Sequence, residues 1–460
     1  MADSLSDFEQ LINLTGVVRG HLFPFLTYKE VGRLGQLSRE CKDVTLSHKA
    51  KAWHVLYLRD FWEGLATDPS STSFGSPIYS EDRRSFDTIV EQPSWKCVYE
   101  KWLFYRRWTH GLVQPNHCIE AIHLWRRLKD IFVKLGLRDI LDSLLPCPEA
   151  NMFQNAMIKS LPSALMALHS VHGGQSAGLN FLSGSSEALL GYFECYHEVY
   201  SMRLASFETL LTQESSLRRP LIFALSETGH FRSFLYLSLD LAETRVEDTI
   251  FLTRRHSSDR VTVGRHGVLS YLNEFAHRLE QGIYERTDFG SISLFPNAGE
   301  SMSRCVTDGI EVRASARWLP QYYPGSVNFA YYIRIRILPE RSIPCQLVGR
   351  RWEFIDGNGQ SSMVTGEGVI GKHPYFFIDD DGKGSYIDLG HGCHGEIFND
   401  AAFTYVSQTG DVAGISIEDT KCAGASGSFS FVPGTIEEPT GPPFDVTVGF
   451  FPFTIPSPFY

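Results

Sequence analysis

A glycine-rich segment near residue 370 offers the most chemistry in this sequence. Gly366–Lys372 reads GEGVIGK, which has the GxGxxG spacing of loops that hold a phosphate through backbone amides. The next residue is His373 rather than the Ser or Thr that would hold Mg²⁺, and Pro374 prevents a helix from starting there. We therefore expect the glycines to serve a tight loop. The alternative is an anion-binding loop, formed by Gly366, Gly368, Gly371 and Lys372.

Three other groups have residue types that bind metals, but their spacing does not fit a metal site. His391, Cys393 and His394 are too close in sequence for one tetrahedral site, so this segment is predicted to be a flexible loop. Asp379–Asp381 begins like a calcium loop but lacks the Glu at the twelfth position, which predicts a hairpin or loop turn. For His169 and His172 no third ligand is near, so we expect a polar role at a helix end.

No motif in the chain combines a nucleophile with a base, since neither GxSxG nor HExxH occurs. We therefore expect a protein that is not an enzyme and needs no cofactor and no metal.

Length and composition predict the number of domains, the compartment and the classes of partner. The chain has 460 residues, a net charge of −11 and nine Cys without a CxxC pair. This length predicts two to four domains, and the scattered cysteines predict reduced thiols in a cytoplasmic or nuclear protein, or one found in both compartments. An acidic chain without an apolar run of membrane-spanning length is expected to bind neither nucleic acid nor a membrane.

A basic segment is an exception to the acidic total. Residues 101–140 hold eight Lys or Arg against three acids, with Trp102, Trp108 and Trp125 among them. We interpret it as an amphipathic connector with buried tryptophans and a solvated basic face. Stacking of the tryptophans on nucleic acid is the alternative.

The predicted secondary structure changes from helices to strands along the chain. Residues 8–62 and 95–141 have helical spacing, separated by a Ser-, Pro- and Gly-rich loop at 63–92. Residues 150–285 mix both types, with helices at Pro162–Val171 and Val268–Leu279 and strands at Leu221–Leu225 and Phe234–Leu239. After residue 305 only strands are predicted, which implies a β-sandwich. These strands are Ile310–Arg317, Phe329–Leu338, Trp352–Ile355, Phe403–Val406, Gly427–Phe431 and Phe444–Phe450.

The first module, residues 8–62, resembles an F-box. Its apolar residues follow that family's order and close at Trp53. The resemblance implies a small all-α bundle that docks on the Skp-type adaptor of a cullin–RING ubiquitin ligase. The residues implied to bind the adaptor are Leu14, Val18, Leu22, Phe25, Leu26, Val31, Leu34 and Leu37. A bundle of this size cannot bury all its apolar side chains, so it needs a partner surface. The alternative is a helical domain packed on the rest of the chain.

The middle module, residues 120–290, resembles the SMI1/KNR4 (SUKH) family. The similarity is carried by Ser160-Leu161-Pro162 and by the segment His169–Gln175, which follows that family's pattern. The family implies an α+β domain that binds proteins. Residues 63–119 would then be a linker with connecting helices.

The third module, residues 303–455, resembles the ApaG domain. Gly366–Pro374 follows that family's GxGVVGxxP motif, and Gly424–Phe431 follows its second glycine motif. The family implies an all-β, fibronectin-like sandwich. The three modules in this order are typical of the eukaryotic F-box only protein 3 family and its plant relatives.

Together the resemblances imply a substrate-recognition subunit of an SCF-type ubiquitin ligase. The F-box would bind the Skp-type adaptor, and the two later domains would bind a protein substrate that the sequence does not identify. Two alternatives stay open: a non-catalytic scaffold protein, and a sensor of small anions or nucleotides that uses the glycine loop.

A substrate-binding segment is expected within the third module. Residues 376–400 look like an insertion that forms a long loop, and Tyr375, Phe377 and Tyr386 are its candidate anchors. Asp379–Asp381 would favour a basic partner. The alternative is a disordered loop whose aromatic side chains pack into the sandwich.

Overall fold

The structure is a computed structural model, and it describes the later three-quarters of the chain with gaps. The described residues are 113, 115–146, 148, 161–175, 188–195, 198–213, 221–227, 234–239, 250–254, 260–264, 267–287, 290–319, 327–387, 397–399, 402–415 and 423–454. They fall into two compact units. The first is Met1–Arg126 with Leu144–Gly174, and the second is Arg127–Ser143 with Gln175–Tyr460.

The described part of the first unit is helical. Helix α7 (Pro115–Lys134) begins at a proline, which suits the first helical position because its missing N–H needs no partner there. Helix α9 (Ser163–His169) buries Leu165 to His169. Trp125, on α7, is only 2% exposed, which confirms the predicted buried tryptophan at this position. Trp102 and Trp108 lie outside the described residues.

The second unit opens with the end of α7 and helix α8 (Arg138–Asp142). Its α+β part contains strands β1 (Tyr192–Cys195), β2 (Glu198–Ser201), β3 (Arg203–Leu204), β4 (Leu221–Glu227), β5 (Phe234–Leu239), β6 (Ile250–Arg254) and β7 (Arg260–Gly264), and helices α10 (Phe207–Gln213) and α11 (Gly267–Glu280). Strands β3 to β7 form one antiparallel sheet in chain order, and β1 pairs with β2.

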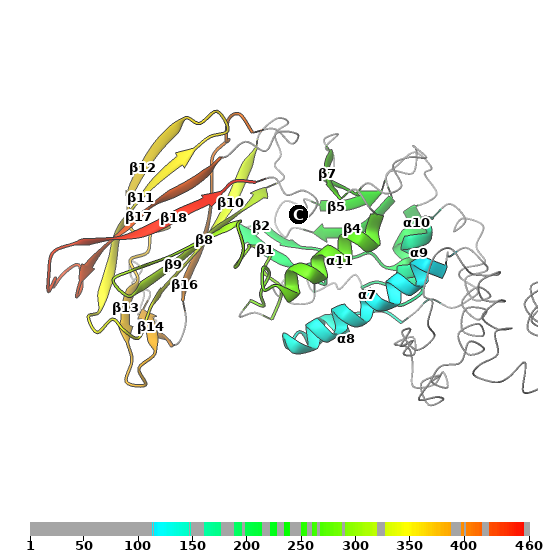
Figure 1. Cartoon of the computed structure of the whole chain (residues 1–460), viewed down its shortest axis with the longest axis horizontal. Helices are drawn as coiled ribbons and strands as arrows, with labels where there is room; N and C mark the ends of the chain where they lie inside the picture. The colour runs from blue at the N-terminus through cyan, green and yellow to red at the C-terminus, as the bar shows by residue number, and fades with distance from the viewer. Residues whose placement is uncertain are drawn as a thin grey trace, which may run out of the picture. The chain divides into compact units, whose positions relative to one another are not determined.

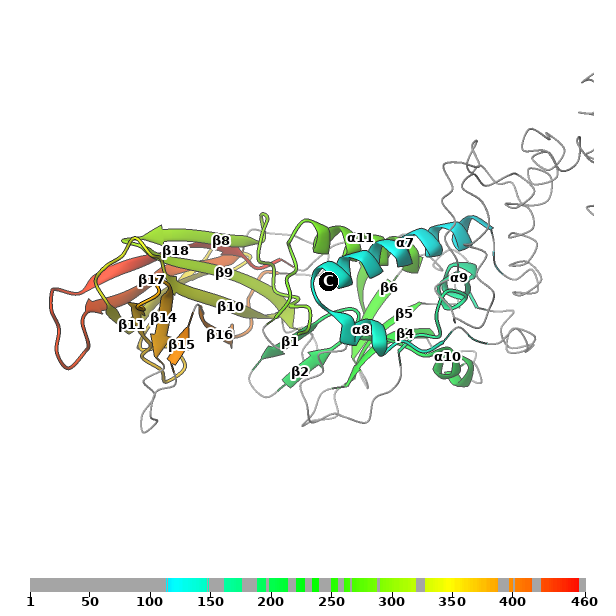
Figure 2. The ribbon, with the colours of Figure 1, turned by 90° about the horizontal axis from the view of Figure 1, so that it is seen from below.

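Helix α11 carries an apolar stripe that the sequence predicted. Val268, Leu272, Phe275 and Leu279 recur every three or four residues, and all are buried. The second half of α7 runs beside α11 (Figures 1 and 2), where Arg127 Nε donates a hydrogen bond to Glu280 Oε1 at 2.7 Å.

The C-terminal part of this unit is an antiparallel β-sandwich. One sheet has the order β16-β10-β9-β8, and the other has β15-β14-β13-β11-β17-β18 with β12 paired to β11 (Figure 1). The strands are β8 (Met302–Thr307), β9 (Ile310–Leu319), β10 (Asn328–Ile337), β11 (Cys345–Ile355), β12 (Ser361–Glu367), β13 (Tyr375–Ile378), β14 (Gly384–Ile387), β15 (Ile397–Asn399), β16 (Phe403–Gln408), β17 (Gly424–Pro433) and β18 (Phe444–Pro452).

Alternation along the strands builds the core of the sandwich. On β10, Phe329, Tyr331, Ile333 and Ile335 alternate along the strand and are buried, while Tyr332 and Arg334 between them are only half-buried. Trp352 on β11 is 2% exposed, and its ring lies 5.6 Å from that of Phe429 on β17. Phe429 belongs to the same sheet, whereas Tyr331 on β10 packs edge-on against Trp352 from the other sheet and so links the two.

The predicted strands after residue 305 are confirmed in position, although several extend further than expected. The prediction of a loop at 376–400 is wrong for the residues of this range that the structure describes. Residues 375–378 and 384–387 form a hairpin, and 397–399 add a third strand beside it. The alternation was missed because these strands are short and interrupted by glycines and aspartates. No described helix is long and apolar enough to cross a membrane.

Candidate functional site

The glycine motif forms a tight turn directly after β12, between β12 and β13. Val369 N donates to Lys372 O at 2.9 Å, and Lys372 N donates back to Val369 O at 2.8 Å. The two residues between them, Ile370 and Gly371, have φ of 44° and 78°. Positive φ at both central positions is the geometry of a type I′ turn, which is unfavourable for a β-branched residue such as Ile370.

Gly368 has a positive φ of 53°, which favours a glycine at this position. A Cβ atom at this position would lie 2.5 Å from Lys372 O and 2.9 Å from the imidazole ring of His373. Arg350 Nη1 donates to Gly368 O at 2.6 Å, and His373 Nδ1 donates to Leu347 O at 3.1 Å. Hydrogen bonds from Arg350 and to Leu347, both on β11, thus hold the turn against this strand.

Most amides of the turn already have carbonyl partners. Gly368 N donates to Val348 O, and Val369 and Lys372 pair with each other. A phosphate cradle needs several amides that converge on an empty space. This arrangement favours a structural use of the glycines, and anion binding by Gly366, Gly368, Gly371 and Lys372 stays a prediction.

The Asp379 turn between β13 and β14 confirms the predicted hairpin turn. Asp379 Oδ1 accepts hydrogen bonds from Asp381 N at 3.1 Å and Lys383 N at 2.7 Å. Ser385 Oγ donates to Asp379 Oδ2 at 3.1 Å. The hydrogen bond from the Lys383 amide is the main reason that the pKa of Asp379 lies below its usual range. The carboxylate is therefore engaged in closing the turn.

The candidate substrate anchors differ in exposure, which corrects the picture of aromatics on an exposed loop. Tyr386 is buried, and its ring lies 5.5 Å from that of Phe403. Tyr375 and Phe377 are half-buried, and their rings stack at 6.0 Å. Alternation on β13 sends these two rings to one face while Phe376 enters the core. A role in substrate binding stays a prediction.

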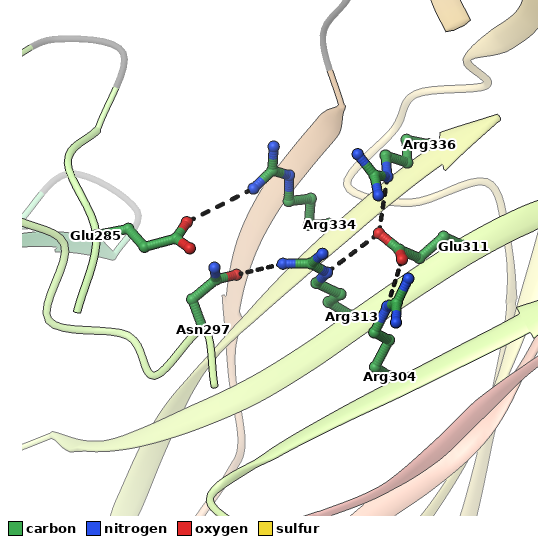
Figure 3. A network of polar contacts seen from close by, with 7 residues as sticks. All are labelled: Glu285, Asn297, Arg304, Glu311, Arg313, Arg334 and Arg336. Carbon is green, nitrogen blue, oxygen red and sulfur yellow. Dashed lines mark hydrogen bonds and ion pairs between the residues drawn. The ribbon is translucent and has the colours of Figure 1, made fainter. Parts of the chain in front are cut away.

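A network of arginines around one carboxylate was not predicted from the sequence (Figure 3). Cross-strand pairing places Arg304, Arg313 and Arg334 side by side on β8, β9 and β10. Like charges at such positions repel each other. Glu311 lies in the next row, and its side chain is only 2% exposed. It pairs with Arg304, with Arg313 Nε at 3.1 Å and with Arg336 Nε at 2.7 Å.

The same arginines hold the segment that precedes the sandwich. Arg313 Nη1 donates to Asn297 Oδ1 at 3.3 Å, and Arg334 Nη1 lies 3.9 Å from Glu285 Oε2 (Figure 3). Alternating charges at Glu311, Arg313, Arg334 and Arg336 were the signal in the sequence that could have placed these residues on one face of the sheet.

Glu311 is an ionised carboxylate that the arginines stabilise. Burial by itself would raise its pKa, but hydrogen bonds from Arg304 and Arg336 and the charge of Arg313 outweigh it, so the pKa lies below its ordinary value. A depressed pKa in the folded state stabilises the protein above the unfolded-state pKa, near 4.3, and this stabilisation is lost as pH falls through the folded-state pKa.

We expect Glu311→Gln to lower the free energy of unfolding at pH 7 by about 1–2 kcal/mol. The loss of stability is expected to be modest because Arg304 is 54% exposed, so solvent screens its interaction with Glu311. The difference from wild type should shrink as pH falls from about 5 toward 3. Urea unfolding across this pH range measures it, with Glu340→Gln at an exposed turn as the control. A difference that does not change with pH would show that Glu311 acts through packing alone.

The two middle histidines are buried at the end of α9. His169 and His172 are at most 1% exposed, and burial lowers the pKa of each to about 3. His172 Nδ1 accepts a hydrogen bond from Gly174 N at 3.1 Å, which confirms the predicted helix-end role for this residue. Both rings are therefore neutral at physiological pH.

Gln175 joins three elements of the second unit. Its Oε1 accepts hydrogen bonds from Leu189 N and Leu204 N at 3.1 and 3.2 Å, and its Nε2 donates to Ser143 Oγ at 2.7 Å. Because both the oxygen and the nitrogen of this buried side-chain amide have hydrogen-bond partners, Gln175 holds the segments around Ser143, Leu189 and Leu204 together.

Several predicted site residues lie outside the described residues. They are the adaptor-binding set Leu14, Val18, Leu22, Phe25, Leu26, Val31, Leu34 and Leu37, and the segment His391–His394.

Comparison with known proteins identifies the C-terminal domain. The ApaG domain family model matches residues 321–380, which include strands β10 to β13 and the glycine turn. Protein ApaG of Anaeromyxobacter sp. (strain K) is 41% identical over 75 residues, or 16% of this chain and 58% of that protein. Protein ApaG of Xanthomonas axonopodis pv. citri is 40% identical over 67 residues, or 14% of this chain and 53% of that protein. The matches thus span little more than half the length of these bacterial proteins. The chain carries a C-terminal ApaG domain.

A longer similarity covers most of the chain. F-box protein SKIP16 of Arabidopsis thaliana is 26% identical over 399 residues, which cover 79% of this chain and 84% of that protein. The chain is therefore similar to an F-box protein beyond its ApaG domain. The F-box and the SMI1/KNR4-like domain themselves stay predictions.

Proposed function

We propose that this chain is the substrate-recognition subunit of an SCF-type ubiquitin ligase. Residues 8–62 would bind the Skp-type adaptor as an F-box, and the SMI1/KNR4-like and ApaG domains would bind the protein substrate. The similarity to an F-box protein over 79% of the chain carries this proposal, since the ApaG domain alone does not account for it. The assembly would act in the cytoplasm, the nucleus or both.

Two buried thiols are not suited to nucleophilic chemistry. Burial raises the pKa of Cys118 to about 12 and that of Cys345 to about 11. A neutral thiol is a poor nucleophile, so these cysteines are suited to packing rather than to carrying ubiquitin. In the proposed complex the transfer chemistry belongs to the partner subunits.

Reconstitution with purified partners tests the proposal. The full chain, mixed with a Skp-type adaptor and a cullin–RING pair, is expected to elute as one complex in size-exclusion chromatography. A chain without residues 8–62 should remain folded by circular dichroism and elute alone. If the full chain elutes alone as well, the proposal is wrong and the scaffold alternative is favoured.

A further inference from the structure

Strand β12 has an open edge in the part of the chain that the structure describes. It pairs only with β11, outside the order of the other strands in its sheet (Figure 1). The edges of β8 and β18 differ, because these strands lie against each other and Thr447 N donates to Thr307 Oγ1 at 3.2 Å.

Two hydrogen bonds show which amides of β12 face away from β11. At one end Asp356 N donates to Gln360 O at 3.0 Å, and at the other Gly368 N donates to Val348 O at 2.7 Å. Bonded and non-bonded pairs alternate along an antiparallel ladder, so the even-numbered residues of β12 are the ones bonded to β11. The residues whose N–H and C=O groups point outward are Ser361, Met363, Thr365 and Glu367.

Most of this edge lacks the features that normally protect one. Ser361–Gly366 reads SSMVTG and contains no charged residue and no proline, and the one charge on β12 is Glu367 at its last position. Met363 and Val364 are 50% and 43% exposed, and they lie on opposite faces of the strand. At the far end Arg350 Nη1 already donates to Glu367 O at 3.1 Å, so an added strand would pair with the backbone groups of Ser361, Met363 and Thr365 and find apolar side chains on both faces.

Charge indicates what kind of strand fits. Arg351 on β11 lies directly opposite Thr365, is exposed, and makes no ion pair or side-chain hydrogen bond with any described residue. A strand added beside β12 would place one residue next to Thr365 on the same face. Two strand spacings are about 10 Å, which the side chains of Arg and Glu together can span.

We propose that the β12 edge binds an extended peptide segment of a partner protein by strand addition. The segment has apolar residues facing Met363 and Val364, and an acidic residue within reach of Arg351. The identification of this partner as a ligase substrate rests on the proposed function, whereas the binding of a peptide to the β12 edge does not. Peptide binding is measured without the adaptor, so failure here and failure of the F-box proposal are separate results.

The test selects a phage-displayed library of random 12-residue peptides on the full chain. A selected peptide is synthesised, and its affinity is measured by fluorescence anisotropy. We expect an alternating apolar pattern with an acid. On hydrogen–deuterium exchange, the peptide should protect the amides of Met363 and Thr365.

Matched variants at one position isolate the backbone contact. Met363→Pro removes an outward N–H without breaking the ladder to β11, and should weaken binding about tenfold or more. Met363→Ala keeps the N–H and should retain most of the affinity. Thr365→Pro is the second variant of the same kind if Met363→Pro melts at a lower temperature. Arg351→Glu should weaken binding, and a peptide with Lys in place of its acid should restore it.

Three results would overturn the proposal. The first is a selection that enriches no peptide on wild type over Met363→Pro, and the second is equal affinity of the peptide for both. The third is a wild-type dimer in sedimentation that Met363→Pro makes monomeric, because a second copy would then occupy the edge.

Discussion

Replacing Leu22 and Leu26 by Asp is expected to abolish co-purification of the Skp-type adaptor. Both leucines belong to the apolar stripe that the F-box resemblance assigns to the adaptor interface. An unpaired carboxylate in a desolvated interface costs roughly 2–5 kcal/mol, so the two together should weaken binding by well over a hundredfold. Isothermal titration with purified adaptor measures the loss.

The control replaces two apolar residues by Asp at exposed positions outside residues 8–62. Val133 and Ile343 are 48% and 53% exposed, so Val133→Asp with Ile343→Asp should leave adaptor binding unchanged. Circular dichroism should show both double variants folded. If the Leu22→Asp/Leu26→Asp chain binds the adaptor as tightly as wild type, residues 8–62 do not act as an F-box.

Gly368→Val is expected to lower the melting temperature of the sandwich by roughly 6–12 °C. A β-branched residue resists the φ of 53° at this position, and its Cβ would overlap with the carbonyl oxygen of Lys372. The two effects together cost about 3 kcal/mol, and each kcal/mol shifts the melting temperature of a domain of this size by about 2–4 °C. Scanning calorimetry of the full chain measures the shift.

Gly371→Val separates the two effects. Gly371 also has positive φ, at 78°, but a Cβ there would have nothing within 4 Å. We expect its melting temperature to fall by about half as much. Thermal shift with ATP and with pyrophosphate tests the anion-sensor alternative on the same proteins. Tight binding that Gly368→Val loses without loss of stability would contradict the structural role of the turn.

The sequence by itself determined the strands and helices that bury one regular face. The β10 and α11 segments were predicted nearly to their ends, because their apolar residues alternate or recur every three to four positions over ten residues or more. The positive φ at Gly368, in contrast, came from the structure, since the glycine motif by itself predicted only a tight loop.

Only the tertiary structure decided what depends on a neighbour. Three short strands after residue 374 were predicted as a loop, because a strand of four residues gains its stability from the sheet that it joins. The pairing of Glu311 with three arginines depends on the register between β8, β9 and β10, which local spacing does not specify. The open edge of β12 likewise follows from which strands pair, and pairing is a property of the whole sheet.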